Sequence, residues 1–159
     1  MTNTRLAFAL LLAIMVAGCT VMIDTKFEPV GVVNSKPGSN IYPDISVNST
    51  WMKYDAVIDK DILYSARRSS ATISIELNDC KGLHIYNLDL YVKDVSIFQV
   101  GSMDGRVFDS ILSSPSKNVI VSFYIKTDMI NRSRNSLCVK FRGGGPLGPK
   151  ISSKLSILK

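Results

Sequence analysis

An alternation of apolar and polar residues with a period of two is the strongest constraint on how this chain can fold. In residues 71–77 every second side chain is apolar, and residues 83–92, 118–127 and 136–143 alternate in a similar way. This period is typical of a β-strand that buries one of its faces. No segment keeps a helical period over three turns. The sequence therefore predicts an all-β fold.

Turn signals divide the chain into short strands. Asp104-Gly105 is typical of a tight turn, so we expect residues 94–101 and 106–112 to form a hairpin around it. Residues 150–158 form the expected last strand.

Two places interrupt the strand pattern. The alternation of residues 83–92 slips at Tyr86-Asn87, which predicts a bulge or a bend there. Residues 128–136 are the best candidate for a short helix, and their polar composition fits a loop equally well.

Many short strands separated by turns indicate a single antiparallel β-sandwich. A small barrel has the same alternation and is the alternative. Parallel pairing would need intervening helices, for which the sequence leaves no room. We assign residues 46–159 to the sandwich domain. Residues 19–45 include Pro29 and Pro37, and we expect an extended lead-in there, with an edge strand at residues 21–27.

The N-terminal apolar run is too short to span a bilayer comfortably. It extends from Leu6 to Ala17, whereas a transmembrane helix needs about 20 apolar residues. Arg5 precedes the run and small residues end it, as in a secretory signal peptide. We therefore expect residues 1–18 to be a signal peptide.

The order Val16-Ala17-Gly18-Cys19 resembles the lipobox of bacterial lipoproteins. The resemblance implies that the thiol of Cys19 carries a diacylglycerol and that cleavage leaves this residue as the new N-terminus. Several acyl chains together give a stable membrane anchor. Thr20 follows the cysteine, where an aspartate commonly signals retention in the inner membrane. The resemblance thus implies an outer-membrane lipoprotein that faces the periplasm.

Two cysteines, Cys80 and Cys138, remain after Cys19 is assigned to the anchor. In an exported chain an even pair is expected to form a disulfide. Two free thiols or a metal site are the alternatives. A metal site needs more ligands, and His84 is the only histidine in the chain. We expect one disulfide and no metal.

The sequence shows no catalytic constellation. A serine nucleophile needs a base, and His84 lies inside a predicted strand, where a packed or surface role is expected. The carboxylates Asp55, Asp59 and Asp61 lie in a polar stretch and are expected to form a solvated face. We therefore expect a protein that is not an enzyme and that needs no cofactor.

Charge is unevenly distributed along the chain. The chain has 19 basic and 13 acidic residues, and no acidic residue follows Asp128. A basic region speeds encounter with an anionic partner, such as an acidic protein or lipid headgroups. Lysines that discourage edge pairing of strands would give the same pattern. Nucleic acid is not expected in the periplasm. The candidate patch for an anionic partner consists of Arg132, Arg134, Lys140, Arg142 and Lys150.

The chain also resembles small enterobacterial lipoproteins in its short lipobox, its cysteine pair, its domain size and "LCVKF" followed by "GGG" near the C-terminus. Several of these are regarded as immunity proteins of type VI secretion, which bind and block a toxic effector, often a phospholipase. The resemblance implies the same role here and assigns no contact residue. A structural lipoprotein of a secretion or envelope complex and an inhibitor of a cell-wall enzyme are the alternatives.

Overall fold

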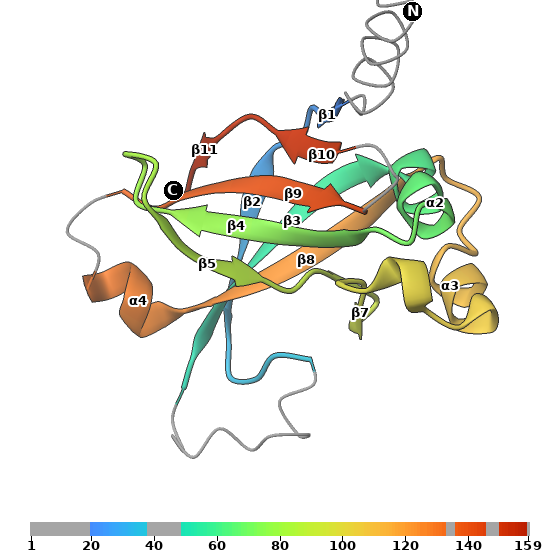
Figure 1. Cartoon of the computed structure of the whole chain (residues 1–159). Coiled ribbons are helices and arrows are strands. Elements are labelled where there is room, and N and C mark those ends of the chain that lie inside the picture. Colours follow the sequence, from blue (N-terminus) through green and yellow to red (C-terminus); the bar gives the residue numbers. More distant parts are fainter. Residues whose placement is uncertain (1–19, 38–48, 133–135, 146–149, 159) are drawn as a thin grey trace, which may run out of the picture.

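The structure is a computed structural model, and Figure 1 shows its two β-sheets packed face to face. The mostly β architecture and the absence of a closed barrel from the described part confirm the predicted sandwich class. The signal peptide, Cys19, Arg134 and the expected domain boundary at residue 46 lie outside the described residues. The structure describes residues 20–37, 49–132, 136–145 and 150–158.

The first sheet, sheet A, has the strand order β1-β10-β9-β4-β5, and β11 also pairs with β9. Its strands are β1 (Thr20–Ile23), β10 (Lys150–Ser153), β9 (Cys138–Gly144), β4 (Thr72–Asn78), β5 (His84–Leu88) and β11 (Ser156–Ile157). The expected last strand at residues 150–158 is thus divided into β10 and β11, which are separated by Lys154 and Leu155.

The second sheet, sheet B, has the order β2-β3-β8-β6-β7. Its strands are β2 (Phe27–Val33), β3 (Trp51–Asp59), β8 (Asn118–Lys126), β6 (Tyr91–Val92) and β7 (Val95–Ser96). The long pair β3 and β8 forms the middle of this sheet. Residues 20–33, which the sequence suggests are part of a lead-in, supply the edge strand of both sheets. Pro29 lies on the edge strand β2, where the missing N–H is tolerated.

The core lies between the two sheets and is filled by alternate residues of the strands. Ile73, Ile75 and Leu77 of β4 point inward and are fully buried. Phe27 of β2 connects the layers, since its ring lies 5.7 Å from that of Phe123 on β8 and 5.5 Å from that of Phe141 on β9. Burial of each large apolar side chain contributes about 1.5–3 kcal/mol.

One strand pair departs from the antiparallel pattern. β1 pairs with β10 in parallel, with Thr20 opposite Lys150 and Ile23 opposite Ser153. A parallel pair needs a long connection. Here nearly the whole domain lies between the two strands in sequence, so no crossover helix is required.

The expected bulge in β5 lies slightly earlier than predicted. Tyr86 is opposite Leu77 and His84 is opposite Asn78, so Ile85 is the extra residue in the strand.

The predicted hairpin around Asp104-Gly105 is wrong. Gly105–Ile111 forms helix α3, and the Asp104 side chain caps it by accepting hydrogen bonds from the backbone N–H groups of Arg106 and Val107 at 2.9 and 3.3 Å. An Asp-Gly pair can begin a helix because the aspartate satisfies free N–H groups at the N-terminus. Val95–Ser96 pairs instead with Tyr91–Val92.

Three further helical segments lie at the ends of the sandwich: α2 (Lys60–Arg68), η1 (Val100–Ser102) and α4 (Thr127–Arg132). The sequence misses α2 because it is short and buries only Lys60, Leu63 and Ala66. α4 occupies the first part of the helical candidate at residues 128–136. In the described part of the chain, no helix has the length and apolar character needed to cross a membrane.

The predicted disulfide between Cys80 and Cys138 is confirmed. Cys138 begins β9 opposite Asn78, the last residue of β4, so the bond joins the end of β4 to its neighbour in the middle of sheet A. The bond closes a loop between residues 58 positions apart.

We predict that replacing both Cys80 and Cys138 with alanine lowers the free energy of unfolding by about 4 kcal/mol, because the unfolded chain is no longer constrained. Urea denaturation of the variant and the wild type measures the difference. A reductant should destabilise the wild type by a similar amount and leave the variant unchanged. A loss below about 1 kcal/mol would contradict a stabilising role for the bond.

Candidate functional site

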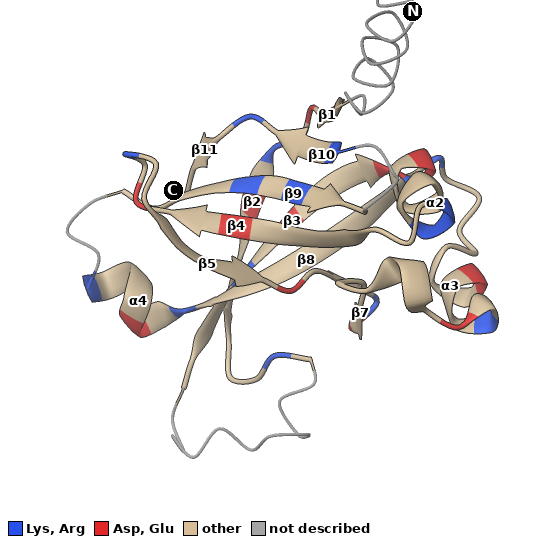
Figure 2. Ribbon diagram, viewed as in Figure 1, with Lys and Arg blue, Asp and Glu red and all other residues tan. Residues whose placement is uncertain are grey.

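The structure brings together part of the predicted basic patch. Lys140 and Arg142 lie two positions apart on β9 and both pair with Glu76, so their side chains share the outer face of sheet A. Figure 2 shows basic positions on β9, in blue, beside an acidic position on β4, in red. Lys150 begins β10, and strand alternation places it on the same face. Arg132 is separate, since it lies on α4 and pairs with Asp128 at 3.8 Å. We call the surface formed by Lys140, Arg142 and Lys150 the basic face.

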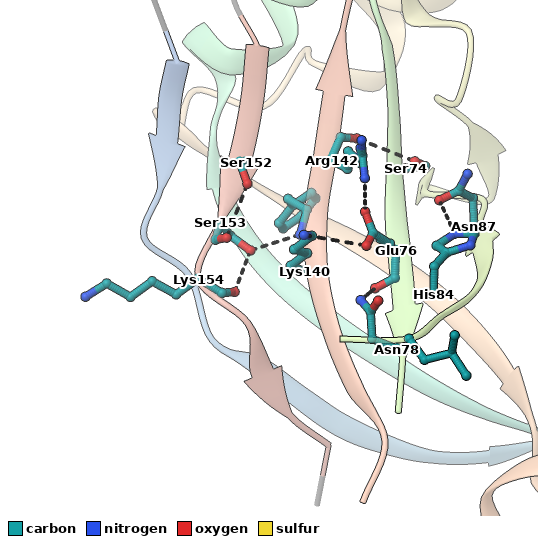
Figure 3. Close-up of polar contacts among 12 residues, drawn as sticks. Ser74, Glu76, Asn78, His84, Asn87, Lys140, Arg142, Ser152, Ser153 and Lys154 are labelled. Atoms are coloured by element: carbon teal, nitrogen blue, oxygen red, sulfur yellow. Dashed lines mark hydrogen bonds and ion pairs between the residues drawn. The ribbon is translucent and has the colours of Figure 1, made fainter. Parts of the chain in front are cut away.

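A buried carboxylate lies at the centre of the basic face (Figure 3). Glu76 of β4 is directly opposite Lys140 of β9. Its carboxylate oxygens accept from Arg142 Nη1 at 2.6 Å and lie 3.5 Å from Lys140 Nζ. The Glu76 side chain is 6% exposed, whereas that of Arg142 is 65% exposed. The two bases therefore cover the carboxylate from the solvent side.

Neighbouring polar groups complete the cluster around Glu76. Asn78 Nδ2 donates to the backbone oxygen of Glu76 at 3.4 Å, and the Ser74 hydroxyl donates to the backbone oxygen of Arg142 at 3.5 Å. His84 is exposed on β5, and its Nε2 lies 3.3 Å from Asn87 Oδ1 (Figure 3). In the described part of the chain, every buried side-chain nitrogen and oxygen atom has a hydrogen-bond partner.

The surroundings of Glu76 keep its carboxylate ionised. Burial raises the pKa of Glu76, but the hydrogen bond from Arg142, the charges of Lys140 and Arg142 and a hydrogen bond with Asn78 outweigh it. The net result is a pKa below the ordinary value. Glu76 therefore neutralises one positive charge of the basic face, which is less cationic than the sequence suggests.

A second surface, which the sequence analysis missed, lies where the outer side of sheet B meets strand β5 of sheet A. It is a pocket of about 190 Å³, which we call the aromatic pocket. Its lining residues come from β3, β5, β6, β8 and the adjoining loops. They are Lys36, Trp51, Tyr86, Asn87, Leu88, Asp89, Tyr91, Tyr124 and Lys126.

Three aromatic rings form the wall of the aromatic pocket. Trp51 packs with Tyr91 and Tyr124 in a cluster separate from the main core. The two tyrosine rings meet edge to face at 5.5 Å. The ammonium groups of Lys36 and Lys126 lie 4.7 and 5.3 Å from the centre of the Trp51 ring. These are cation–π distances, so the ring helps to hold two positive charges at the pocket.

Tyr91 remains a neutral hydrogen-bond donor in this pocket. Burial, the negative charge of Asp89, the neighbouring Tyr124 and a hydrogen bond with Asp89 raise the pKa of Tyr91 to about 12. The Tyr91 hydroxyl is therefore protonated at any physiological pH.

The sequence contained a signal for this pocket. The alternation of residues 118–127 puts Val121, Phe123 and Ile125 on the inner side, which leaves Tyr124 and Lys126 facing outward. A large aromatic residue on the solvent side of a strand is a hint of a binding surface. The sequence of this one strand could not show which other residues line the pocket, because Trp51 and Tyr91 come from distant segments.

The other candidates from the sequence have structural roles. Asp59 caps α2 by accepting from the backbone N–H of Asp61 at 2.9 Å, and it pairs with Lys117 at 2.9 Å. Asp55 accepts from the Ser122 hydroxyl at 2.6 Å and lies 3.5 Å from Lys53 Nζ. Among the residues that the structure describes, no three histidine, cysteine or acidic side chains are grouped as metal ligands.

We predict that Glu76→Gln lowers the free energy of unfolding at pH 7 by about 1–3 kcal/mol, because it removes a charged partner of Arg142 and Lys140. The pKa of Glu76 is lowered in the folded state, so its contribution is complete well above pH 4.5 and is lost as the pH falls through the lowered pKa. Urea denaturation between pH 3 and pH 7 should show the two proteins converging in acid.

Glu28→Gln is the matched control, since Glu28 is exposed on the edge strand β2. It should change the stability by less than about 0.5 kcal/mol. A Glu76→Gln protein as stable as the wild type at pH 7 would contradict the proposed contribution of the ion pairs.

The two surfaces offer different chemistry. The basic face presents cations around a carboxylate that is already paired, and the aromatic pocket presents two ammonium groups beside apolar rings. Comparison of the chain with protein-family models, with curated proteins and with solved structures gave no match. The chemistry of these surfaces is therefore interpreted from their own geometry and charge.

Proposed function

We propose that this protein is a lipid-anchored lipoprotein of the outer membrane that faces the periplasm and acts by binding a protein partner. The leading candidate for the partner is a type VI secretion effector such as a phospholipase, which the protein would neutralise as an immunity protein. The proposal assigns no catalytic step to the chain.

The short distance between the expected anchor and the domain supports this arrangement. β1 begins at Thr20, directly after Cys19, and pairs with β10 at the edge of sheet A. A lipid on Cys19 would therefore hold that edge of the sandwich close to the bilayer. Such a tether limits the directions from which a partner can approach.

The disulfide also fits an exported protein. Disulfides persist in oxidising compartments such as the periplasm and are rare in the cytosol. The bond between Cys80 and Cys138 joins two strands of sheet A, and it would preserve that sheet outside the cell's reducing interior.

The aromatic pocket is the observation that carries the binding proposal. Trp51, Tyr91 and Tyr124 lie on the outer side of sheet B, away from the core that the fold needs. Tryptophan and tyrosine are the residues most enriched at the energetic centres of protein interfaces. Lysines beside them add a positive potential that favours an acidic partner.

We predict that a strain lacking this gene is killed by the effector encoded beside it, and that the wild-type gene restores survival. Cys19→Ser should abolish acylation, so the protein should leave the membrane fraction and lose the mass of the acyl chains. Viability counts under effector exposure, cell fractionation and mass spectrometry measure these outcomes.

Thr20→Ser is the matched control, because it leaves the lipobox cysteine in place, and it should behave as the wild type. Survival of the deletion strain at the wild-type level would contradict the immunity role. An unchanged mass and location of the Cys19→Ser protein would contradict the anchor.

A further inference from the structure

We propose that the outer face of sheet A lies against the phosphate headgroups of the bilayer that holds the expected lipid anchor. This inference rests on the proposed function, because it requires the anchor, and it goes further by assigning the orientation of the domain on the membrane. We call the contacting surface the docking face. It consists of Met22, Lys140, Arg142, Lys150, Lys154 and Ile157.

The position of the anchor brings the docking face to the membrane. β1, β10 and β11 lie along one side of sheet A (Figure 1). Thr20, the first residue of β1, is joined directly to Cys19 and pairs with Lys150 of β10. Neighbouring strands are about 4.8 Å apart, so the flexible side chain of Lys150 can reach the headgroups around the anchor. A lipid on Cys19 therefore leaves this edge of the sheet close to the bilayer.

The register of sheet A adds exposed apolar side chains to the docking face. Met22 pairs with Ser152, which is opposite Arg142, so Met22 shares the outer face with Arg142. Ile157 is opposite Cys138, which strand alternation places on the same side of β9 as Arg142. The exposed fractions are 58% for Met22 and 64% for Ile157. Apolar side chains next to basic ones are typical of surfaces that lie in the interface of a membrane.

The charge of the docking face favours anionic lipids. Lys150 and Lys154 are exposed, and neither forms an ion pair with another described residue. Figure 3 shows the Lys154 side chain extended away from the cluster around Glu76. The four basic side chains of the docking face outnumber the carboxylates of Glu76 and of Asp24, the exposed residue that follows β1. Basic residues held next to a bilayer are attracted to its anionic headgroups.

An acidic protein is the other occupant that this charge would suit. The bilayer is favoured because the anchor is continuous with the docking face, so the membrane is already beside it. Docking through sheet A also turns the outer side of sheet B away from the bilayer, because the two sheets pack face to face. Trp51, Tyr91 and Tyr124 would then be accessible to a partner in the periplasm.

Quenching by a nitroxide lipid, which acts over a short range, shows which face lies on the bilayer. The variants M22C, I157C and V32C each introduce a single free thiol, because the native cysteines form the disulfide or, under the proposal, carry the lipid. V32C is the matched control, since Val32 lies on β2 of sheet B and is 58% exposed, as Met22 is.

Each full-length, acylated variant is labelled with the fluorophore NBD and reconstituted into vesicles of phosphatidylethanolamine and phosphatidylglycerol that contain the nitroxide lipid. We expect quenching at positions 22 and 157 to be about threefold stronger than at position 32, because only the first two labels lie in the interface. The difference should shrink in vesicles of phosphatidylcholine alone. It should also shrink in about 1 M salt, where charges are screened within about 3 Å.

Charge reversal tests the contribution of the lysines. K150E/K154E should reduce the quenching at position 157 in the anionic vesicles, and K150Q/K154Q should have a smaller effect in the same direction. The matched control K93E/R106E makes the same change of charge at exposed residues of the β6–β7 turn and α3, and it should leave the quenching unchanged. Circular dichroism and thermal unfolding verify that each variant is folded.

Equal quenching at positions 22, 157 and 32 in an acylated protein would refute the docking and leave the anchor and the immunity role intact. Stronger quenching at position 32 would reverse the orientation. Quenching that is insensitive to salt, lipid charge and K150E/K154E would contradict the role of the cations. If K150E/K154E does not fold, salt and lipid charge still decide.

The remaining outcomes separate the docking from the proposed function. An unquenched label at position 157 whose emission changes when the effector is added would assign the docking face to an acidic protein. Absence of acyl groups from Cys19 by mass spectrometry would refute the anchor and the docking together. Survival of the deletion strain would refute the immunity role whatever the labels show.

Discussion

The packing of the two inner sheet faces is the interaction on which the rest of the structure depends. Phe27 contacts Phe123 within its own sheet and Phe141 in the opposite one, so a single ring connects the layers. Because side chains alternate along a strand, burial of Phe123 and Phe141 also determines which of their neighbours face outward. A shift of one residue in either strand would bury the polar side chains and expose the core. The outer surfaces are therefore fixed by the core.

The outer faces of the two sheets differ in how the core packing arranges their charged side chains. On sheet A the pairing of β4 with β9 brings Glu76 opposite Lys140, and the resulting cluster satisfies its own charges. On sheet B the pairing of β3 with β8 puts Trp51 opposite Lys126, and two ammonium groups gather over one ring. In the first arrangement Lys140 and Arg142 already form ion pairs with Glu76, so less of their charge is left to bind a partner. The second forms a pocket lined by aromatic rings and lysines, which is why we propose recognition at that pocket.

Most of the fold could be predicted from the sequence, because alternation reports directly on strands with one buried face. The disulfide could be predicted because Cys80 and Cys138 were an even pair in a chain with export features. The hairpin predicted at Asp104-Gly105 was wrong because the same pair suits both a hairpin turn and a helix N-terminus. Tertiary packing determines which of the two forms. The sequence named the three residues of the basic face but not their carboxylate partner, because register brings Glu76 to Lys140. It did not reveal the aromatic pocket, because topology brings Tyr91 to Trp51.

Amide hydrogen exchange of the full-length protein, with and without the proposed effector partner, tests the central claim most directly. The account predicts slower exchange on effector binding at the strand ends around the aromatic pocket, residues 51–53, 89–92 and 124–126. Exchange in β9 should be unchanged. Protection confined to β4 and β9 would move recognition to the basic face. The absence of protection anywhere in the chain would contradict an account based on binding.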